Sequence, residues 1–320
     1  MMRPHIKGSS ILVTGGAGFI GSHLVDQLIL QGAKEVIIID NMFLGNENNL
    51  KDAILKGAIL YKDDIEITSS LDYIFQIHNI DIVFNCATKA LNYSFVNPKN
   101  AFDTNVNGIL NILEHQRAGR FKTLVHFSTS EVYGTAVYEP MDEKHPINPT
   151  TTYAAGKAAA DVAINSYVNM FDLDAFIVRP FNNYCPRQNH KGYMAGIIPI
   201  TVSRILNDIN PEIHGTGLQS RDFIYVLDTV DAILKLYPKM KKAESINIST
   251  DGQISMNDVV LRIVNIMEYK GEILKKEARG ADVKCHNASN KKIKALIDYQ
   301  LTPFEIGLEK TIKWYMENIK

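Results

Sequence analysis

The chain has 320 residues, of which 46% are hydrophobic and 22% charged, and its formal net charge is −1. This length suits two closely packed lobes better than one core. The balanced charge gives no electrostatic case for a nucleic acid or a membrane surface as partner.

Cysteine usage and the N-terminal residues bear on the compartment. Cys86, Cys185 and Cys285 stand far apart without metal-ligand spacing, which argues against a disulfide framework and a metal site. The first residues lack the apolar core of a signal peptide, and no stretch approaches the roughly 18 apolar residues of a membrane span. We therefore expect a cytoplasmic protein.

The first apolar run, residues 11–14, ends in a glycine-rich turn. Gly15, Gly18 and Gly21 are spaced three apart, and a helical pattern follows over residues 22–31. Such a turn brings backbone N–H groups and the positive end of a helix to a pyrophosphate. A second strand, residues 36–39, ends at Asp40 about 20 residues on, where an acid that binds a ribose is expected. The pattern favours a dinucleotide site over a purely structural turn.

The first half of the chain alternates β-branched runs with amphipathic helices, including one over residues 105–117. This alternation predicts an α/β fold, a doubly wound Rossmann sheet with right-handed crossovers. Its ligand crevice should lie beyond the carboxyl ends of the strands. The further strands of the sheet are expected at residues 59–61, 82–85, 124–128 and 175–178.

The character of the chain changes after Arg179 and Pro180, where residues 182–186 have the composition of a turn. We expect a nucleotide-binding domain formed by residues 1–180 plus a returning segment, 222–243. A smaller C-terminal α/β lobe should comprise residues 181–221 and 244–320. Its elements are expected near residues 197–206, 212–214, 245–248, 256–267 and 309–319, with an extended segment at 221–226 and a helix at 228–236 in the return.

Tyr153 and Lys157 stand four residues apart, hence on one face of a helix. A phenol with a pKa of about 10 is a poor base at neutral pH. An ammonium one turn away and the positive nicotinamide of a bound cofactor would favour the phenolate. We therefore interpret the pair as an acid–base catalyst.

A third catalytic group is expected where strand 124–128 ends, in the sequence Ser-Thr-Ser-Glu-Val-Tyr-Gly. A hydroxyl there can bond the substrate oxygen that Tyr153 deprotonates. Glu131 carries more information, because alcohol oxidation alone needs no carboxylate beside the site of hydride transfer. The alternatives are a strand end that satisfies only backbone groups, and a solvated turn carboxylate.

Together these residues resemble the extended short-chain dehydrogenase/reductase family, the nucleotide-sugar epimerases, dehydratases and decarboxylases. The resemblance covers nearly the whole chain and implies NAD as cofactor. Tyr153 with Lys157 is similar to the catalytic pair of the family, and the expected cofactor contacts are Gly15, Gly18, Phe19, Ile20, Gly21, Asp40, Asn41, Asp64, Ile65, Ala87, Asn105 and Ser128. Of these, Asp40 favours NAD over a 2′-phosphate, Asp64 and Ile65 hold the adenine, and Asn105 braces the active-site strand.

The same resemblance implies a nucleoside-diphosphate sugar as substrate, most often a UDP-sugar. Its contacts are expected from Asn182 and Arg187, in a loop motif where Cys185 replaces a usual glycine, and from Arg221 and Arg279. Guanidinium groups suit bidentate phosphate binding. Family members commonly pair through the helices that contain residues 105–117 and 153–168, so a homodimer is expected.

The reaction within the family is a choice among alternatives. Thr129 and Glu131 resemble the hydroxyl and the C5 base of 4,6-dehydratases and uronate decarboxylases, whereas many 4-epimerases have a small uncharged residue in place of Glu131. Ser130 stands where some dehydratases carry an aspartic acid that protonates the leaving hydroxyl. We favour a 4,6-dehydratase acting on a UDP-linked hexose or N-acetylhexosamine. A 4-epimerase, a uronate decarboxylase and a non-catalytic NAD- or sugar-sensing module are the alternatives.

Overall fold

The computed structural model describes residues 3–277 and 286–319. Its centre is a seven-stranded, wholly parallel sheet in the order β11-β6-β5-β4-β1-β2-β3. The short β-branched runs of the sequence form its strands, as expected for strands buried on both faces. These strands are β1 (Ser10–Thr14), β2 (Glu35–Ile39), β3 (Ile59–Tyr61), β4 (Ile82–Asn85), β5 (Thr123–Phe127), β6 (Asp174–Pro180) and β11 (Ser245–Ile248).

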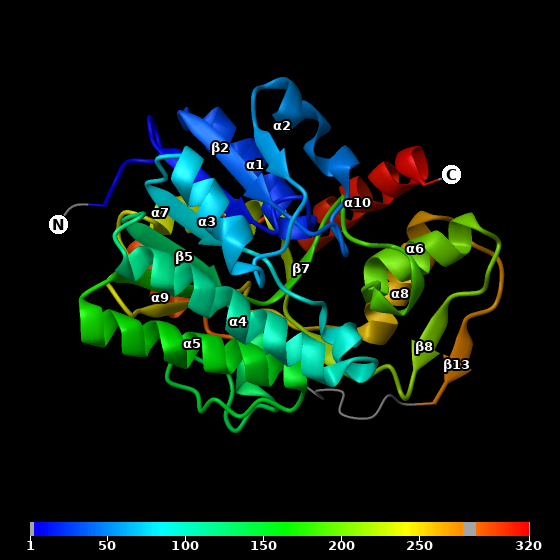
Figure 1. Ribbon diagram of the computed structural model, residues 1–320. Coiled ribbons are helices and arrows are strands. Elements are labelled where there is room, and N and C mark those ends of the chain that lie inside the picture. The colour runs from blue at the N-terminus through cyan, green and yellow to red at the C-terminus, as the bar shows by residue number, and fades with distance from the viewer. Residues whose placement is uncertain (1–2, 278–285, 320) are drawn as a thin grey trace.

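Helices cover both faces of the sheet, and α4 and α5 run side by side across one of them (Figure 1). Alternate residues of each strand face opposite sides, so Leu12 packs with the α3, α4 and α5 side and Ile11 with the α1 and α7 side. The first layer consists of α3 (Thr68–Ile77), α4 (Pro98–Arg117) and α5 (Thr152–Phe171). The second consists of α1 (Phe19–Leu30), α2 (Lys51–Leu55), α7 (Val226–Leu236) and α9 (Lys291–Leu296).

The seventh strand, β11, corrects the expected domain boundary. The sequence pattern places residues 245–248 in the second lobe. In the structure, however, Ile246 and Ile248 are buried in the core of the first lobe's sheet, and their strand pairs with β6. Helix α9 packs on β11 through Ile293, so this part of the chain also belongs to the first lobe. The sequence of a four-residue strand does not show which strand it will pair with. Only the crossover through α7 brings β11 beside β6.

The strand order reverses between β1 and β4, since β2 and β3 lie on one side of β1 and β4 to β6 on the other. Such a switch point leaves a crevice beyond the carboxyl ends of the two central strands. The glycine turn follows β1, and residues 86–88 follow β4. The topology therefore places both segments at the edge where the sequence predicts a ligand.

The second lobe has its own core, in which Val202, Ile263 and Ile312 are buried. It lies beside the carboxyl edge of the sheet (Figure 1). Its helices are α6 (Ile197–Leu206), α8 (Met256–Ile266) and α10 (Phe304–Asn318), and its short strands are β7 (Asn182–Tyr184), β8 (Glu212–His214), β9 (Ser220–Arg221), β10 (Phe223–Tyr225), β12 (Ile254–Ser255) and β13 (Leu274–Lys276). The 3₁₀ turns η1 (Glu47–Leu50), η2 (Leu91–Phe95), η3 (Ser130–Tyr133) and η4 (Gly192–Met194) complete the elements.

Three helices begin three or more residues earlier than the sequence pattern predicts. Helix α1 starts at Phe19 rather than at residue 22, directly after the glycine turn. Helix α4 starts at Pro98 rather than at residue 105, because the Asn97 side chain accepts from the N–H of Asn100 and proline suits the first helical position. Helix α10 starts at Phe304 rather than at residue 309.

Candidate active site

The glycine turn between β1 and α1 forms an open cradle. Gly15 has φ +66°, and a Cβ on Gly21 would lie 2.3 Å from the Gly15 carbonyl oxygen, so both positions require glycine. A Cβ on Gly18 would meet only that same oxygen, at 3.1 Å, and otherwise open space. Helix α1 begins immediately afterwards, so its first N–H groups face this space. The cradle therefore fits a pyrophosphate, as NAD requires.

Asp40, at the end of β2, is buried and lines the same cavity. Its Oδ2 accepts from the N–H of Ala17 at 2.9 Å, and its Oδ1 from the N–H of Met42 at 2.9 Å. Burial raises the pKa of this carboxyl above its usual value, although those N–H groups oppose the shift. Asp40 thus fixes the glycine turn from the end of β2, where the sequence predicts an acid that binds a ribose.

The expected adenine contacts also gather at one end of the cavity. Asn41 donates from Nδ2 to Asp64 Oδ2 at 2.7 Å, which joins the ends of β2 and β3. Ile65 is buried beside them and packs against α4, where a Cβ on Gly108 would come within 2.4 Å of its Cδ1. All three residues line the cavity.

The cavity has a volume of about 390 Å³, within the usual range for ligand pockets. It runs from the Asp40 and Asp64 end, past the glycine cradle, to the side chains of Thr129 and Tyr153. Gly15, Gly18, Phe19, Ile20, Gly21, Ala87, Ser128, Ser130, Glu131 and Lys157 also line it. One continuous cavity therefore collects the residues that the sequence assigned to the cofactor and to catalysis, apart from Asn105.

Asn105 lies behind the cavity wall rather than in it. It is buried, its Oδ1 accepts from Thr88 Oγ1 at 2.8 Å, and its Nδ2 donates to the Ala101 and Tyr153 carbonyl oxygens. It therefore joins the end of β4 to the start of α5. This placement matches the expected bracing role and not a direct cofactor contact.

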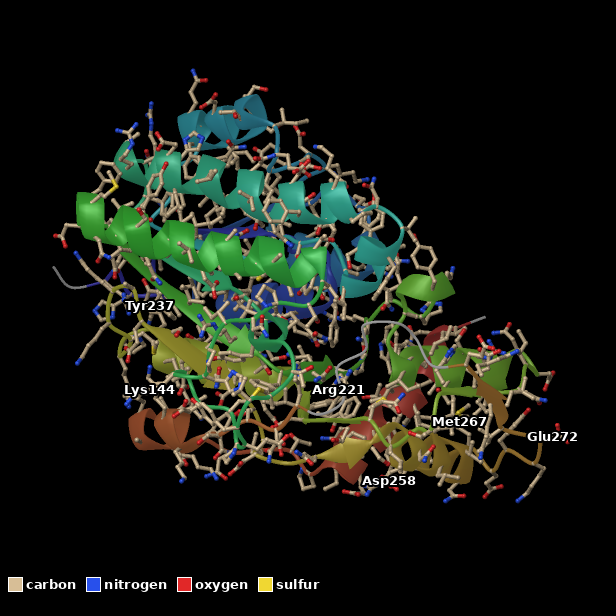
Figure 2. All side chains as sticks on the ribbon, turned by 90° about the horizontal axis from the view of Figure 1, so that it is seen from below. Lys144, Arg221, Tyr237, Asp258, Met267 and Glu272 are labelled. Atoms are coloured by element: carbon tan, nitrogen blue, oxygen red, sulfur yellow. The ribbon has the colours of Figure 1, made fainter. Side chains whose placement is uncertain are left out.

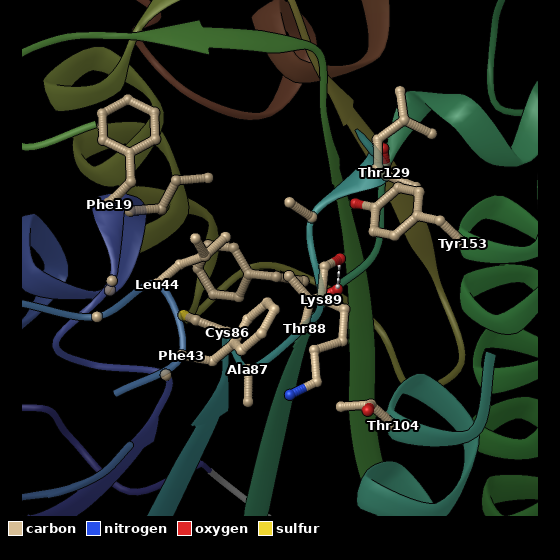
Figure 3. Close-up of a pocket in the computed structure, with 18 of the residues that line it drawn as sticks. Phe19, Phe43, Leu44, Cys86, Ala87, Thr88, Lys89, Thr104, Thr129 and Tyr153 are labelled. Atoms are coloured by element: carbon tan, nitrogen blue, oxygen red, sulfur yellow. Dashed lines mark hydrogen bonds between the residues drawn. The ribbon is translucent and has the colours of Figure 1, made fainter. Parts of the chain in front are cut away.

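Tyr153 occupies the first turn of α5, and its hydroxyl points toward Thr129 at the end of β5 (Figure 3). Helix α5 is set at this point by Thr151, whose hydroxyl accepts from the N–H of Ala154 at 3.2 Å. Burial raises the pKa of Tyr153 to about 12, hydrogen bonds from Thr129 and Thr88 oppose the shift, and the charge of Glu131 adds to it. In the protein alone, Tyr153 is therefore a neutral phenol.

Lys157, one helical turn from Tyr153, is tied to the end of β5. Its Nζ donates to the Phe127 carbonyl oxygen at 2.8 Å, and the side chain is almost fully buried. Burial lowers the pKa of Lys157 to about 8, while Asp161 and Cys86 oppose the shift. In the protein alone, burial therefore outweighs any effect of this ammonium on the pKa of Tyr153, and a bound nicotinamide would add further positive charge.

Behind the strand end lies a buried polar cluster. Ser128 Oγ donates to Asp161 Oδ2 at 3.0 Å, and the same oxygen accepts from Arg179 at 3.0 and 3.1 Å. Arg179 in turn donates to the Tyr133 hydroxyl, which donates to Asn247 Oδ1 at 2.7 Å. The cluster locks β5, β6, α5 and η3 together, so Ser128 is held from behind.

Glu131, in the 3₁₀ turn η3, is buried and lines the cavity. Its N–H donates to Thr129 Oγ1 at 3.2 Å, so the turn that presents Thr129 also fixes Glu131. The interpretation as a solvated turn residue is therefore wrong. A carboxylate is held at the reacting end of the cavity, close enough to Tyr153 to raise the pKa of that phenol.

The expected substrate contacts are distributed differently. Asn182 lines the first cavity and also a second one of about 340 Å³, which Arg221 lines as well. Arg221 lies between the body of the first lobe, marked by Tyr237, and the outer part of the second, marked by Met267 and Glu272 (Figure 2). The two cavities share Asn182, Asn183, Gln188, Met194, Ala90 and Leu91, and so are contiguous.

Among the expected substrate contacts that the structure describes, Arg187 is not brought to these cavities. Arg187 lines neither, and its Nη1 pairs with Asp26 Oδ2 of α1 at 2.7 Å, which is a contact between the lobes. The loop that carries it turns through Arg187 with φ +72°. Arg279 lies outside the described residues, as does Cys285.

Sequence reasoning took Ala87 from the segment after β4 but assigned no role to Thr88 or Lys89 of the same segment. Thr88 opposes the rise in the pKa of Tyr153, as Thr129 does, and Lys89 lies 4.1 Å from the ring centroid of Phe43, a cation–π contact in the cavity wall. Thr88 follows a strand end, as Thr129 does, and this shared position is the signal that could have found it. Phe43 had no such signal.

Across residues 3–277 and 286–319, no helix is long and apolar enough to cross a membrane. Within the same ranges, no three His, Cys, Asp or Glu side chains form a group that could hold a metal ion. Cys86 and Cys185 are free thiols.

Comparison with known proteins shows where this site belongs. The sequence matches the NAD dependent epimerase/dehydratase family over residues 11–249. A Methanocaldococcus jannaschii protein provisionally named UDP-glucose 4-epimerase is 35% identical, with 96% of this chain and 99% of that protein covered. The Bos taurus dTDP-D-glucose 4,6-dehydratase is 30% identical, with 98% and 91% covered.

The solved structures agree. DesIV, a dTDP-glucose 4,6-dehydratase from Streptomyces venezuelae with NAD and TYD bound, superposes with a TM-score of 0.91 at 27% identity, and 97% of each chain is covered. Other matches include UDP-glucose 4-epimerases and UDP-glucuronic acid decarboxylases. The chain therefore belongs to the NAD-dependent epimerase/dehydratase family, within the extended short-chain dehydrogenase/reductases that act on nucleotide sugars, and its cofactor is NAD.

Proposed function

We propose that this chain is a nucleotide-sugar 4,6-dehydratase, a lyase that acts on a UDP-linked hexose or N-acetylhexosamine. The observation that supports this choice is the burial of Glu131 beside Tyr153. A carboxylate there raises the pKa of the catalytic phenol and so makes its phenolate costlier. In a 4-epimerase, the carboxylate would raise the pKa of Tyr153 and have no catalytic role. In a dehydratase, the same carboxylate can serve as the base that takes the C5 proton.

When bound, NAD accepts a hydride from C4 of the sugar and later returns it at C6. Tyr153 takes the proton of the C4 hydroxyl, while Thr129 holds that oxygen in place. Glu131 then takes the proton from C5, which the C4 ketone has made acidic. The electron pair of the C5–H bond becomes the C5–C6 double bond, and the C6 hydroxyl leaves as water with the proton that Glu131 has taken. A proton returned to C5 completes a 4-keto-6-deoxy sugar.

The binding assignments follow the same division of the cavity. Asp40, Asn41, Asp64 and Ile65 would hold the adenosine, and the glycine cradle with the first turn of α1 would hold the pyrophosphate. Asn182 and Arg221 would contact the diphosphate of the substrate, because they lie where the two cavities meet or in the second one. Arg279 stays a proposed contact from the sequence alone.

A second candidate is a nucleotide-sugar 4-epimerase, an isomerase. Ser130 favours it, because this buried hydroxyl stands where some dehydratases have an acid for the C6 oxygen. The relative with 35% identity also bears an epimerase name. In this reaction Glu131 would be a bystander, and the ketone would only turn over before reduction.

The products of a small panel of UDP-, GDP- and dTDP-sugars, weighed by mass spectrometry, separate the two candidates. A 4,6-dehydratase gives a product lighter by one water, and we expect it from a UDP-sugar. A product of unchanged mass and inverted C4 configuration would establish the epimerase instead. Carbon dioxide release from a UDP-uronic acid would identify a decarboxylase, and no turnover of any sugar would leave a sensing module.

We further propose a homodimer in which α4 and α5 of two chains form a four-helix interface. Val162 and Met170 of α5 are 62% and 69% exposed, which leaves apolar surface on this helix layer. Sedimentation of the wild type against Val162→Glu measures this, and a wild-type monomer would contradict it. The free thiols Cys86 and Cys185 agree with the cytoplasm as the proposed compartment.

A further inference from the structure

Two loops on opposite sides of the glycine turn are in contact with each other. The sheet order places β1 between β2 and β4, so the loop after β2 and the loop after β4 flank the turn that follows β1. Phe43 belongs to the first loop and Lys89 to the second. The Nζ of Lys89 lies 4.1 Å from the centroid of the Phe43 ring, and the two side chains lie next to each other in the cavity (Figure 3). This contact therefore joins the two walls of the crevice.

Lys89 brings a positive charge into the cavity. The residue is only 7% exposed, and it lines the same cavity as Gly15 and Gly18. Among the carboxylates that the structure describes, none forms an ion pair with its Nζ. An ammonium in a nearly buried place is costly without a counter-charge, and the face of the Phe43 ring offsets only part of that cost. The cavity therefore contains a charge that favours an anionic ligand.

The loop of Phe43 is packed against the residues that are expected to hold the adenosine. The N–H of Phe43 donates to Asn41 Oδ1 at 3.0 Å, and a Cβ on Gly45 would lie 2.5 Å from Asp40 Oδ1. The Phe43 ring also contacts Tyr93 of η2 edge-on, with the ring centroids 4.9 Å apart. The ring that faces Lys89 is therefore held in place by residues from both sides of the crevice.

We propose that Lys89 and Phe43 form a clasp that retains bound NAD, and that Lys89 supplies a positive charge to the diphosphate of the cofactor. A diphosphate is the anion that the glycine cradle fits. A dinucleotide in that cradle lies between the two walls that the clasp joins, so the clasp must open before the cofactor leaves. Retention suits a dehydratase and an epimerase alike, because the hydride that NAD accepts is returned to the sugar in each cycle.

Two variants remove the two halves of the clasp. Lys89→Met keeps an unbranched side chain of similar length and removes its charge. Phe43→Leu keeps an apolar side chain and removes the ring face that the ammonium contacts. Lys56→Met, at an exposed position outside the cavity, is the matched control for the loss of one positive charge.

The test follows the release of radiolabelled NAD from the loaded protein during a chase with unlabelled NAD. We expect release to be faster by roughly tenfold or more in Lys89→Met, because a charge-assisted contact is lost. In Phe43→Leu it should be faster by roughly threefold, because only the cation–π contact is lost. Lys56→Met should release NAD as the wild type does. Wild-type release in Lys89→Met, or an equal acceleration in Lys56→Met, would overturn the proposal.

The diphosphate of a sugar nucleotide is the other anion that Lys89 could bind, and calorimetry distinguishes the two. Lys89→Met should bind ADP-ribose roughly tenfold or more weakly as nucleotide-free protein, and should bind UDP within about twofold of the wild type when NAD-loaded. The reverse pattern would assign Lys89 to the substrate and overturn the clasp.

Thermal unfolding distinguishes the clasp from a purely structural role. The Tm of nucleotide-free Lys89→Met should not fall below that of the wild type, because the variant lacks an ammonium without a counter-charge. The increase in Tm on addition of NAD should be smaller than in the wild type. A lower Tm without NAD, together with wild-type release of NAD, would show that Lys89 only stabilises the fold.

Discussion

The Nζ of Lys157 donates to the carbonyl oxygen of Phe127 at 2.8 Å, and this one contact ties the start of α5 to the end of β5. Thr129 follows Phe127 by two residues, and Tyr153 precedes Lys157 by one helical turn. The bond therefore sets the relative position of Thr129 and Tyr153, the two side chains proposed to contact the substrate oxygen. Lys157 therefore has a structural role, since its hydrogen bond holds α5 against the end of β5, in addition to any effect of its charge.

The burial of Lys157 predicts a pH-dependent stability difference. Its folded pKa, about 8, lies below the unfolded value of 10.5, so its contribution to stability is fully present above pH 10.5 and is lost as pH falls through about 8. As the pH rises from 8 to 10.5, the free energy of unfolding of the wild type should increase relative to that of Lys157→Met, by at most about 3 kcal/mol. Urea unfolding at pH 7.5 and 10 measures this, with the exposed Lys122→Met as control. Equal pH trends for both variants would refute it.

Tyr153 should titrate at two different pH values depending on the cofactor. Burial raises its pKa to about 12 in the protein alone, so it should stay a neutral phenol up to that pH. A bound NAD adds positive charge and should lower the midpoint. The ultraviolet difference between wild type and Tyr153→Phe, recorded with and without NAD, reports this phenolate. The same midpoint in both states would show that the cofactor does not activate Tyr153.

The glycine cradle predicts different outcomes for two alanine substitutions. Gly21→Ala places a Cβ 2.3 Å from the Gly15 carbonyl oxygen, so α1 must move and Tm should fall by several degrees. Gly18→Ala adds a Cβ into the open space of the cradle, so Tm should hold while NAD binding weakens roughly tenfold or more. Thermal unfolding and NAD titration measure the pair. Equal losses of stability in both variants would contradict the pyrophosphate cradle.

The two arginines of the second lobe should differ in kinetics. Arg221→Gln should raise KM for the sugar nucleotide at least tenfold, because a phosphate loses a guanidinium partner. Arg187→Gln should change KM only a few-fold and lower stability by about 1 kcal/mol, since it loses its pair with Asp26. Steady-state kinetics decide between them. If Arg187→Gln has the larger effect on KM, that loop rearranges to bind the substrate.

The parts of this account that were predictable from the sequence are those with a local signal. The spacing of Gly15, Gly18 and Gly21, and that of Tyr153 and Lys157, follows from turn and helix geometry, and the structure places them at one cavity. Contacts between segments that are far apart in the chain have no such local signal in the sequence. The edge position of β11 and the contact of Arg187 with Asp26 arise only when segments far apart in the chain meet.

The electrostatics of the site were the least predictable part. From the sequence, the ammonium of Lys157 should favour the phenolate, but burial dominates and the pKa of Tyr153 rises. The extent of desolvation depends on every group that closes the cavity, Glu131 among them, and not on helical spacing. His286 lies within 3.7 Å of Glu131 although it is more than 150 residues further along the chain, and a contact over that separation leaves no local pattern in the sequence.

The most direct test of Glu131 as the C5 base is turnover of a UDP-sugar in heavy water, followed by measurement of deuterium at C5 of the product. The account predicts that the wild type gives a product lighter by one water that carries solvent deuterium at C5, because Glu131 removes that proton. It also predicts that Glu131→Gln lowers turnover by roughly 10²–10⁴-fold. A product of unchanged mass without deuterium at C5, formed by Glu131→Gln within a few-fold of the wild-type rate, would contradict it.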